Sequence, residues 1–146
     1  MSNINDGLKL TGKLSIALNG KVVQEIDNLV TTAGKGFVAS SMLKTTSNSP
    51  AAMTHMAVGT GTTDPAAGDT ALQSESGRVA LTSSAVSAAV VTYVATFPAG
   101  TATAALTEAG ILNASSSGTL LCRTEFAVVN KGSSDAMTIT WTVTVS

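Results

Sequence analysis

The C-terminal stretch AMTITWTVTVS, residues 136–146, alternates large apolar side chains with threonines. The apolar set is Met137, Ile139, Trp141, Val143 and Val145. Successive side chains of a strand point to opposite faces, so this set shares one face and the threonines share the other. Threonine is β-branched and favours strands too. The pattern predicts a strand with one buried face, and Trp141, Ile139 and Val143 are expected in the core.

A second alternating stretch lies near the N-terminus. Leu8, Leu10, Leu14, Ile16 and Leu18 alternate with polar or small residues up to Asn19-Gly20. Asn-Gly accepts the positive φ angles of a two-residue hairpin turn. Residues 8–18 and 21–30 are therefore predicted to form a β-hairpin.

The remaining pattern predicts one helix and several short strands. Phe37, Val38, Ser41 and Met42 fall at helical spacing, which predicts a helix over residues 33–43 capped by Thr32. Strands are predicted at residues 54–58, 78–84, 90–97, 109–114 and 119–128, with the turns NASSSGT (113–119) and NKGSSD (130–135). Phe126, on the strand at 119–128, is expected in the core.

Many short strands and one helix indicate a mainly β protein, an antiparallel β-sandwich of jelly-roll or immunoglobulin-like type. The length of 146 residues suits one domain, predicted over residues 8–146. Residues 1–7 are polar and unpatterned, which predicts a flexible N-terminal arm.

The composition is poor in charge. Charged residues make up 12% of the chain and the net charge is −1, whereas Thr, Ala and Ser number 22, 22 and 17. We therefore expect neither nucleic acid nor a membrane as partner. A neutral surface rich in hydroxyls and small residues suits packing against copies of the chain or another protein. No secretory signal is recognised, and the single cysteine, Cys122, cannot form an internal disulfide, which fits synthesis in a cytoplasm.

The stretch GTGTTDPAAGDT, residues 59–70, raises the question of a phosphate site. It lacks the third glycine of a dinucleotide motif and the Lys-Ser or Lys-Thr of a P-loop. We interpret it as an exposed connection at a contact surface whose carboxylates meet basic groups of a partner. The candidate interface residues are Gly59, Thr60, Gly61, Thr62, Thr63, Asp64 and Asp69. Two carboxylates alone do not make a cation site.

Histidine and cysteine chemistry is not expected. His55 is the only histidine and lies in a predicted strand, where no second feature marks it as a catalytic base. Cys122 also lies in a predicted strand and is interpreted as a buried structural thiol. We expect no catalytic residues, no metal and no cofactor.

Four charged residues stand out in so neutral a chain: Arg78, Glu108, Arg123 and Glu125. We expect them to form ion pairs that fix strand order or a subunit contact. The alternative is an acid–base pair of Glu108 and Glu125, as in a hydrolase acting on cell-wall sugar. Nearby arginines suit the structural interpretation better.

A set of motifs, in order, resembles a family of small virion proteins of tailed bacteriophages. They are AVGTG, TALQSE followed by an arginine, EAGI followed by GTLL and RT.F, and ITW.V.V. The resemblance runs from about Asn28 to the end of the chain. It implies a structural component of a phage particle, made in the bacterial host cytoplasm, and carries no catalytic residues.

Two placements on the particle are compatible with this resemblance. The first is a capsid decoration (cement) protein on the outer shell, often a trimer, which binds the major capsid protein and bridges coat subunits. The second is a tail fibre or baseplate component that contacts the host surface, for instance a glycan. The shortage of aromatic residues, five in all, favours the capsid placement.

Overall fold

The alternating C-terminal stretch forms strand β9, Met137–Val145, in the middle of one half of the sheet. Its apolar face is buried: Ile139 and Trp141 are fully enclosed and Val143 is 4% exposed. β9 lies between β1 and β6, so that Trp141 has Leu14 on one side and Tyr93 on the other. The predicted strand and its core residues are confirmed, and Phe126 is buried as expected.

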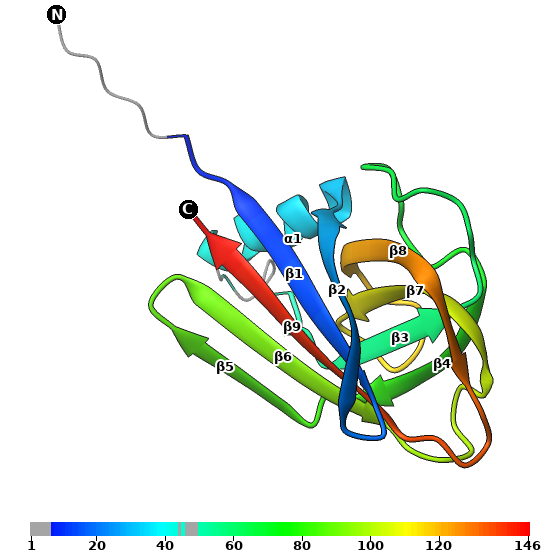
Figure 1. Cartoon of the computed structure of the whole chain (residues 1–146). Helices are drawn as coiled ribbons and strands as arrows, with labels where there is room; N and C mark the ends of the chain where they lie inside the picture. The colour runs from blue at the N-terminus through cyan, green and yellow to red at the C-terminus, as the bar shows by residue number, and fades with distance from the viewer. Residues whose placement is uncertain (1–6, 44, 46–49) are drawn as a thin grey trace, which may run out of the picture.

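The computed structural model describes residues 7–43, 45 and 50–146 (Figure 1). The predicted arm, residues 1–7, lies outside the described residues apart from Gly7. The elements are β1 (Leu10–Leu18), β2 (Lys21–Val30), α1 (Thr32–Leu43), β3 (His55–Gly59), β4 (Glu75–Ala80), β5 (Ser83–Ser87), β6 (Val90–Phe97), β7 (Ala104–Leu112), β8 (Leu120–Lys131) and β9 (Met137–Val145).

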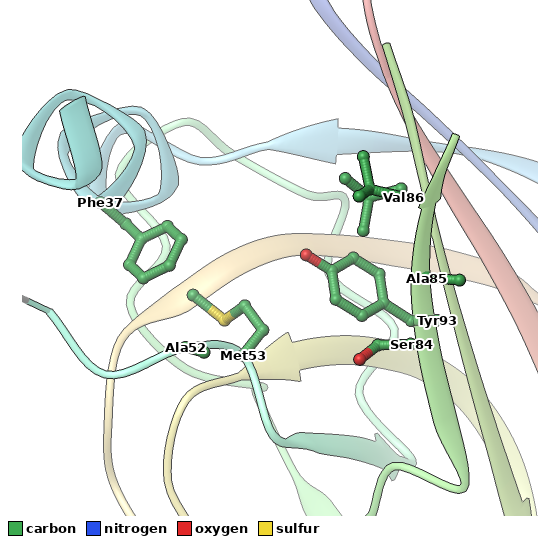
Figure 2. Close-up of a pocket in the computed structure, with 8 residues that line it drawn as sticks. Phe37, Ala52, Met53, Ser84, Ala85, Val86 and Tyr93 are labelled. Carbon is green, nitrogen blue, oxygen red and sulfur yellow. The ribbon is translucent and has the colours of Figure 1, made fainter. Parts of the chain in front are cut away.

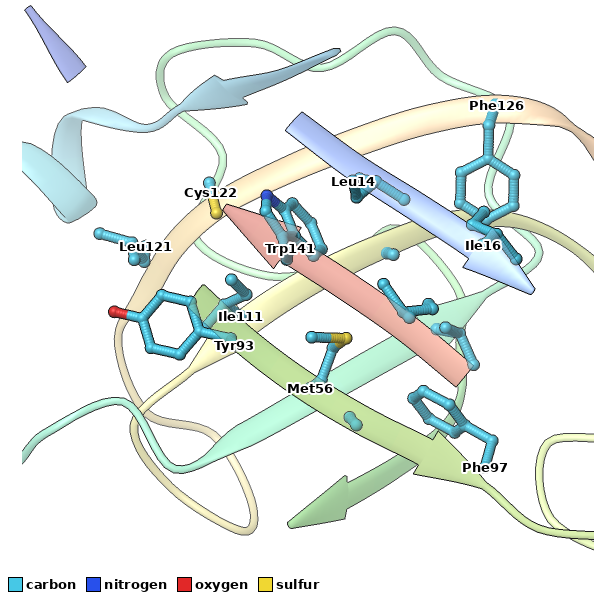
Figure 3. Packing of buried hydrophobic residues seen from close by; sticks show 14 of the residues in the cluster. Leu14, Ile16, Met56, Tyr93, Phe97, Ile111, Leu121, Cys122, Phe126 and Trp141 are labelled. Atoms are coloured by element: carbon cyan, nitrogen blue, oxygen red, sulfur yellow. The ribbon is translucent and has the colours of Figure 1, made fainter. Parts of the chain in front are cut away.

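In the described part of the chain, nine antiparallel strands form one curled sheet in the order β4-β3-β7-β8-β2-β1-β9-β6-β5. β2 belongs to both halves: it pairs with β1 along most of its length, and its end, Leu29 and Val30, pairs with Arg123 and Cys122 of β8. The sheet folds over at this strand, and the core fills the space between β1, β9 and β6 on one side and β3, β7 and β8 on the other (Figure 3). The predicted antiparallel β-sandwich with one short helix is confirmed.

The β1–β2 hairpin turns at Asn19 and Gly20, whose φ angles are 50° and 83°. These positive values are those that the Asn-Gly pair was expected to accept. The hairpin of β7 and β8 is also present, although both strands are longer than predicted.

The predicted strand at residues 78–84 is wrong, because the chain there forms two strands in different halves of the sheet. β4 ends at Ala80 and β5 begins at Ser83. Between them, the Leu81 amide donates to the Thr54 carbonyl and the Thr82 amide to the Val94 carbonyl. Two residues thus carry the chain from one edge of the curled sheet to the other.

The cap of α1 is Thr31 rather than the predicted Thr32. The amide of Gly34 donates to Oγ1 of Thr31 at 2.9 Å, and that hydroxyl donates to the carbonyl of Leu120 at 2.7 Å. One buried side chain therefore closes the first turn of the helix and joins it to β8. Within the described part of the chain, no helix has the length and apolar character that crossing a membrane requires.

The indole of Trp141 has a hydrogen-bond partner across β1. Its Nε1 donates to Oδ1 of Asn28 at 2.8 Å. β1 runs between the two, and Gly12 lies opposite both Asn28 and Val143. A Cβ on Gly12 would overlap the Asn28 amide, so glycine is needed where the Asn28 side chain crosses β1. Trp141 is thereby positioned by a polar contact as well as by packing.

Trp141→Ala is expected to lower the free energy of unfolding by about 3–5 kcal/mol, because it leaves a large cavity in the core. Urea denaturation followed by circular dichroism measures this. Thr140→Ala, on the exposed face of the same strand, is the control and is expected to change stability by less than about 0.5 kcal/mol. Equal effects of the two substitutions would contradict the assignment of Trp141 to the core.

Candidate functional site: the loop between β3 and β4

The loop between β3 and β4, residues 60–74, covers the outer face of the half-sheet formed by β3, β7 and β8. Two small residues, Ala57 of β3 and Gly110 of β7, lie opposite each other where the loop crosses this face. Arg123 of β8 lies on the other side of Gly110. Leu72 of the loop packs there with Ala57, Leu112 and Leu120. The loop is thus held against its own sheet by a small apolar cluster.

Glu108 of β7 is fully buried beneath this loop. Its Oε2 accepts the amides of Gly61 at 2.8 Å and Ser74 at 2.7 Å. Its Oε1 accepts the amide of Gln73 at 2.8 Å and two nitrogens of Arg123, Nε at 3.1 Å and Nη2 at 3.0 Å. One carboxylate therefore holds both ends of the loop through charge-assisted hydrogen bonds.

Arg123 of β8, 2% exposed, extends this anchorage to the middle of the loop. Its Nη1 donates to Oδ2 of Asp69 at 3.0 Å and its Nη2 to the carbonyl of Thr63 at 2.9 Å. Asp69 also accepts the Ala66 amide at 2.9 Å. The guanidinium thus has partners on the sheet and at two points of the loop, which compensates its removal from water.

Gly59 and Gly61 bring the backbone close to this carboxylate. A Cβ on Gly59 would lie 2.7 Å from Oε2 of Glu108, and a Cβ on Gly61 would lie 2.7 Å from its Cδ. Both distances are shorter than a carbon side chain tolerates. Gly59 is therefore explained by close approach to the Ser74 carbonyl and to Glu108, and Gly61 by close approach to Glu108 and Gln73, so that neither glycine requires a phosphate.

The four charged residues singled out in the sequence do not form one cluster. Glu108 pairs with Arg123, as expected, but Arg78 pairs with Glu75 at 2.7 Å. Arg78 also donates to the carbonyls of Ala114 and Ser117, both at 2.9 Å, so it supports the β7–β8 turn. Arg78 thus forms an ion pair, but with a residue outside the four that the sequence singled out.

Glu125 lies directly opposite Glu108 in the register of β7 and β8 and is half-buried. The two carboxylates are thus neighbours, as an acid–base pair requires. Glu108, however, is 0% exposed and each of its oxygens already accepts at least two donors. Both oxygens of Glu108 are therefore engaged by the protein itself, which is the arrangement of a side chain that anchors a loop.

Asp64 and Asp69 have different roles within the candidate interface loop. Asp69 is half-buried and engaged with Arg123, so it is not free for basic groups of a partner. Asp64 is exposed, as are Thr60, Thr62 and Thr63. The outer side of the loop, and Asp64 within it, is the part that can contact another protein.

The remaining candidates occupy ordinary structural positions. His55 is half-buried in β3 with its Nδ1 2.8 Å from Oγ1 of Thr54. Cys122 is fully buried, and burial raises the pKa of its thiol. No group of three or more His, Cys, Asp or Glu side chains placed to hold a metal ion occurs among the described residues.

An apolar hollow of about 300 Å³ lies apart from this loop, between α1 and the β5–β6 hairpin. Phe37 and Met53 form one wall, and Ser84, Val86 and Tyr93 form the other (Figure 2). None of the described residues that line the hollow is charged. The hollow therefore suits apolar side chains better than a polar ligand.

The chain matches no protein-family model, no curated protein and no solved structure.

Glu108→Gln is expected to destabilise the fold by about 3–5 kcal/mol, because it leaves the buried Arg123 with only the half-buried Asp69 as ionic partner and turns an amide group toward backbone donors. Chemical denaturation measures the loss, and hydrogen exchange is expected to accelerate at the amides of Gly61, Gln73 and Ser74. Glu125→Gln, one strand away, is the matched control and is expected to cost less than about 1 kcal/mol. Unchanged protection of the three amides in Glu108→Gln would contradict the anchoring role.

Gly61→Ala is expected to destabilise the chain more than Gly68→Ala, which changes a glycine in the same loop. A Cβ on Gly61 overlaps Glu108, whereas a Cβ on Gly68 meets nothing within 4 Å. Thermal melts of the two variants test this. Equal melting temperatures would contradict this prediction and show that the loop backbone can move away from Glu108 without loss of stability.

Proposed function

We propose that the chain is a structural protein of a bacteriophage particle and that it decorates the outer capsid shell by binding the major capsid protein. The main support for the proposal is that residues from separate motifs of the resemblance come into contact in the structure. AVGTG supplies Gly59 and Gly61, TALQSE supplies the amides of Gln73 and Ser74, EAGI supplies Glu108, and the following RT supplies Arg123. Motifs up to 64 positions apart in the chain thus form one anchored unit.

This unit of loop, Glu108 and Arg123 suits a protein that bears mechanical load. A decoration protein strengthens a shell by carrying load between the subunits that it contacts. A loop joined to two strands by a buried ion pair resists displacement better than a loop held only by its ends. Its exposed threonines and Asp64 then present a fixed surface to the coat.

The absence of charge from the segment that contains β5 and β6 supports assembly with other proteins. No Asp, Glu, Lys, Arg or His occurs from residue 79 to residue 107, a stretch that includes β5 and β6. Charged residues are depleted at the centres of protein interfaces because their desolvation is costly. Exposed apolar side chains such as Met42 and Val86 add to this character.

The aromatic side chains favour the capsid over a glycan-binding tail. Sugar sites use exposed aromatic faces, but Trp141, Phe97, Phe126 and Tyr93 are buried and Phe37 is half-buried. All five aromatics of the chain are thereby engaged in the interior or at its edge. The resemblance is compatible with both placements, whereas the burial of the aromatic side chains favours capsid decoration.

The test uses particles of the encoding phage from which the chain has been deleted. Purified chain is added back, and its occupancy on shells and the temperature of DNA release are measured. We expect binding to the shell and a higher release temperature. Asp64→Lys is expected to weaken binding by at least about tenfold, equal to about 1.4 kcal/mol. Asp27→Lys, an exposed charge reversal on β2, is the matched control and is expected to bind as the native chain does.

Binding to isolated tails and not to shells would contradict the proposal and favour the fibre or baseplate role. Equal binding by Asp64→Lys and the native chain would refute the assignment of the loop to the coat contact.

A further inference from the structure

The two edges of the curled sheet are protected to very different degrees. β4 carries Glu75 and Arg78. Charged side chains are one of the common ways of preventing an edge strand from pairing with another chain.

β5, Ser83–Ser87, lacks this protection. All five residues are exposed, and the sequence SSAVS contains no charge and no proline. Its register with β6 runs without a bulge from Ser83 to Ser87. One side of β5 thus presents a regular row of backbone groups to which none of the strands in the described part of the chain is paired. Such an edge is a ready template for strand addition.

We infer that β5 is a self-association edge, at which two copies of the chain pair β5 with β5 antiparallel around a two-fold axis. The sequence of β5 indicates that the strand added to it is β5 of a second copy. Centred on Ala85, the pairing places Ser83 opposite Ser87 and Ser84 opposite Val86 of the second copy. No charge is desolvated or repelled, because neither β5 nor the adjoining β6 carries any. A two-fold axis also closes the contact, because each β5 edge is then used up and only the charged β4 edges stay unpaired.

The hollow beside β5 gives this pairing a side-chain component. Ser84 and Val86 lie on the face of β5 that looks toward Met53 and Phe37, whereas Ala85 points the other way (Figure 2). Val86 is 71% exposed although it lies on the same face as the buried Tyr93. In the paired state, Val86 of each copy lies beside Ser84 of the other on this face. Both valines then lose contact with water over the apolar hollow.

The contact is small, and this sets its expected strength. Pairing five residues buries less than the roughly 1,200 Å² of a standard stable interface, so we expect a weak, concentration-dependent dimer. On a shell, neighbouring copies would be held at high effective concentration and the same contact would be occupied. That consequence rests on the proposed function, but the pairing in solution does not.

The experiment is sedimentation velocity on the full chain from about 10 µM to about 1 mM, where weak dimers form. The native chain is expected to shift from monomer to dimer. Ala85→Lys and Ala85→Glu are each expected to remain monomeric, because like charges then face each other across the axis. An equimolar mixture of the two is expected to restore dimers. Ala105→Lys, at an exposed alanine of β7, is the matched control and is expected to dimerise.

The inference would be overturned if the native chain stayed monomeric at all concentrations or formed mainly trimers. It would also be overturned if the Ala85→Lys variant dimerised as strongly as the native chain. Trp141 fluorescence verifies that each variant is folded. If the Ala85 variants do not fold, Val86→Ser serves instead and is expected to weaken the dimer by at least about fivefold, since the side chain that becomes buried is lost. An unweakened dimer in that variant would overturn the inference equally. Because the assay contains no phage particle, its outcome is independent of the proposed placement on the capsid.

Discussion

The buried ion pair of Glu108 and Arg123 is the interaction on which the loop side of the molecule depends. Each partner alone would be a charge removed from water, and each is compensated by the other and by hydrogen bonds to the loop. The glycines at 59 and 61, the small residues beneath Leu72 and the carboxylate of Asp69 all serve the same arrangement. A segment of fifteen residues without helix or strand thereby becomes a defined part of the surface.

The sequence predicts those parts of the fold in which one face is buried and the other is not. β9 is recognisable because Trp141 and its neighbours alternate with threonines, and the β1–β2 turn because Asn19-Gly20 has a specific backbone preference. β5 was not predicted, since all its residues are exposed and no alternation marks it. Arg123 was among the residues expected to pair with Glu108, but its three other partners were hidden, because they are backbone amides 34 to 47 positions away. A glutamate within the apolar stretch ALTEAGIL was the one available sign that a buried charge needed a partner.

The two sides of the molecule suggest complementary roles in an assembly. The anchored loop presents exposed threonines and Asp64 on a rigid base, which suits a partner with polar or basic groups. The edge at β5 is neutral and regular, which suits an identical edge. A protein that both binds a shell and contacts its own copies would connect neighbouring sites, and cohesion would then grow with the number of occupied sites.

The copy number of the chain in purified particles tests the central claim most directly. It is measured by quantitative mass spectrometry against the major capsid protein of the same particles. A decoration protein is predicted to be present in numbers comparable to the coat protein, because it occupies repeated sites across the whole shell. A few copies to a few dozen per particle would contradict this account and place the chain on the tail.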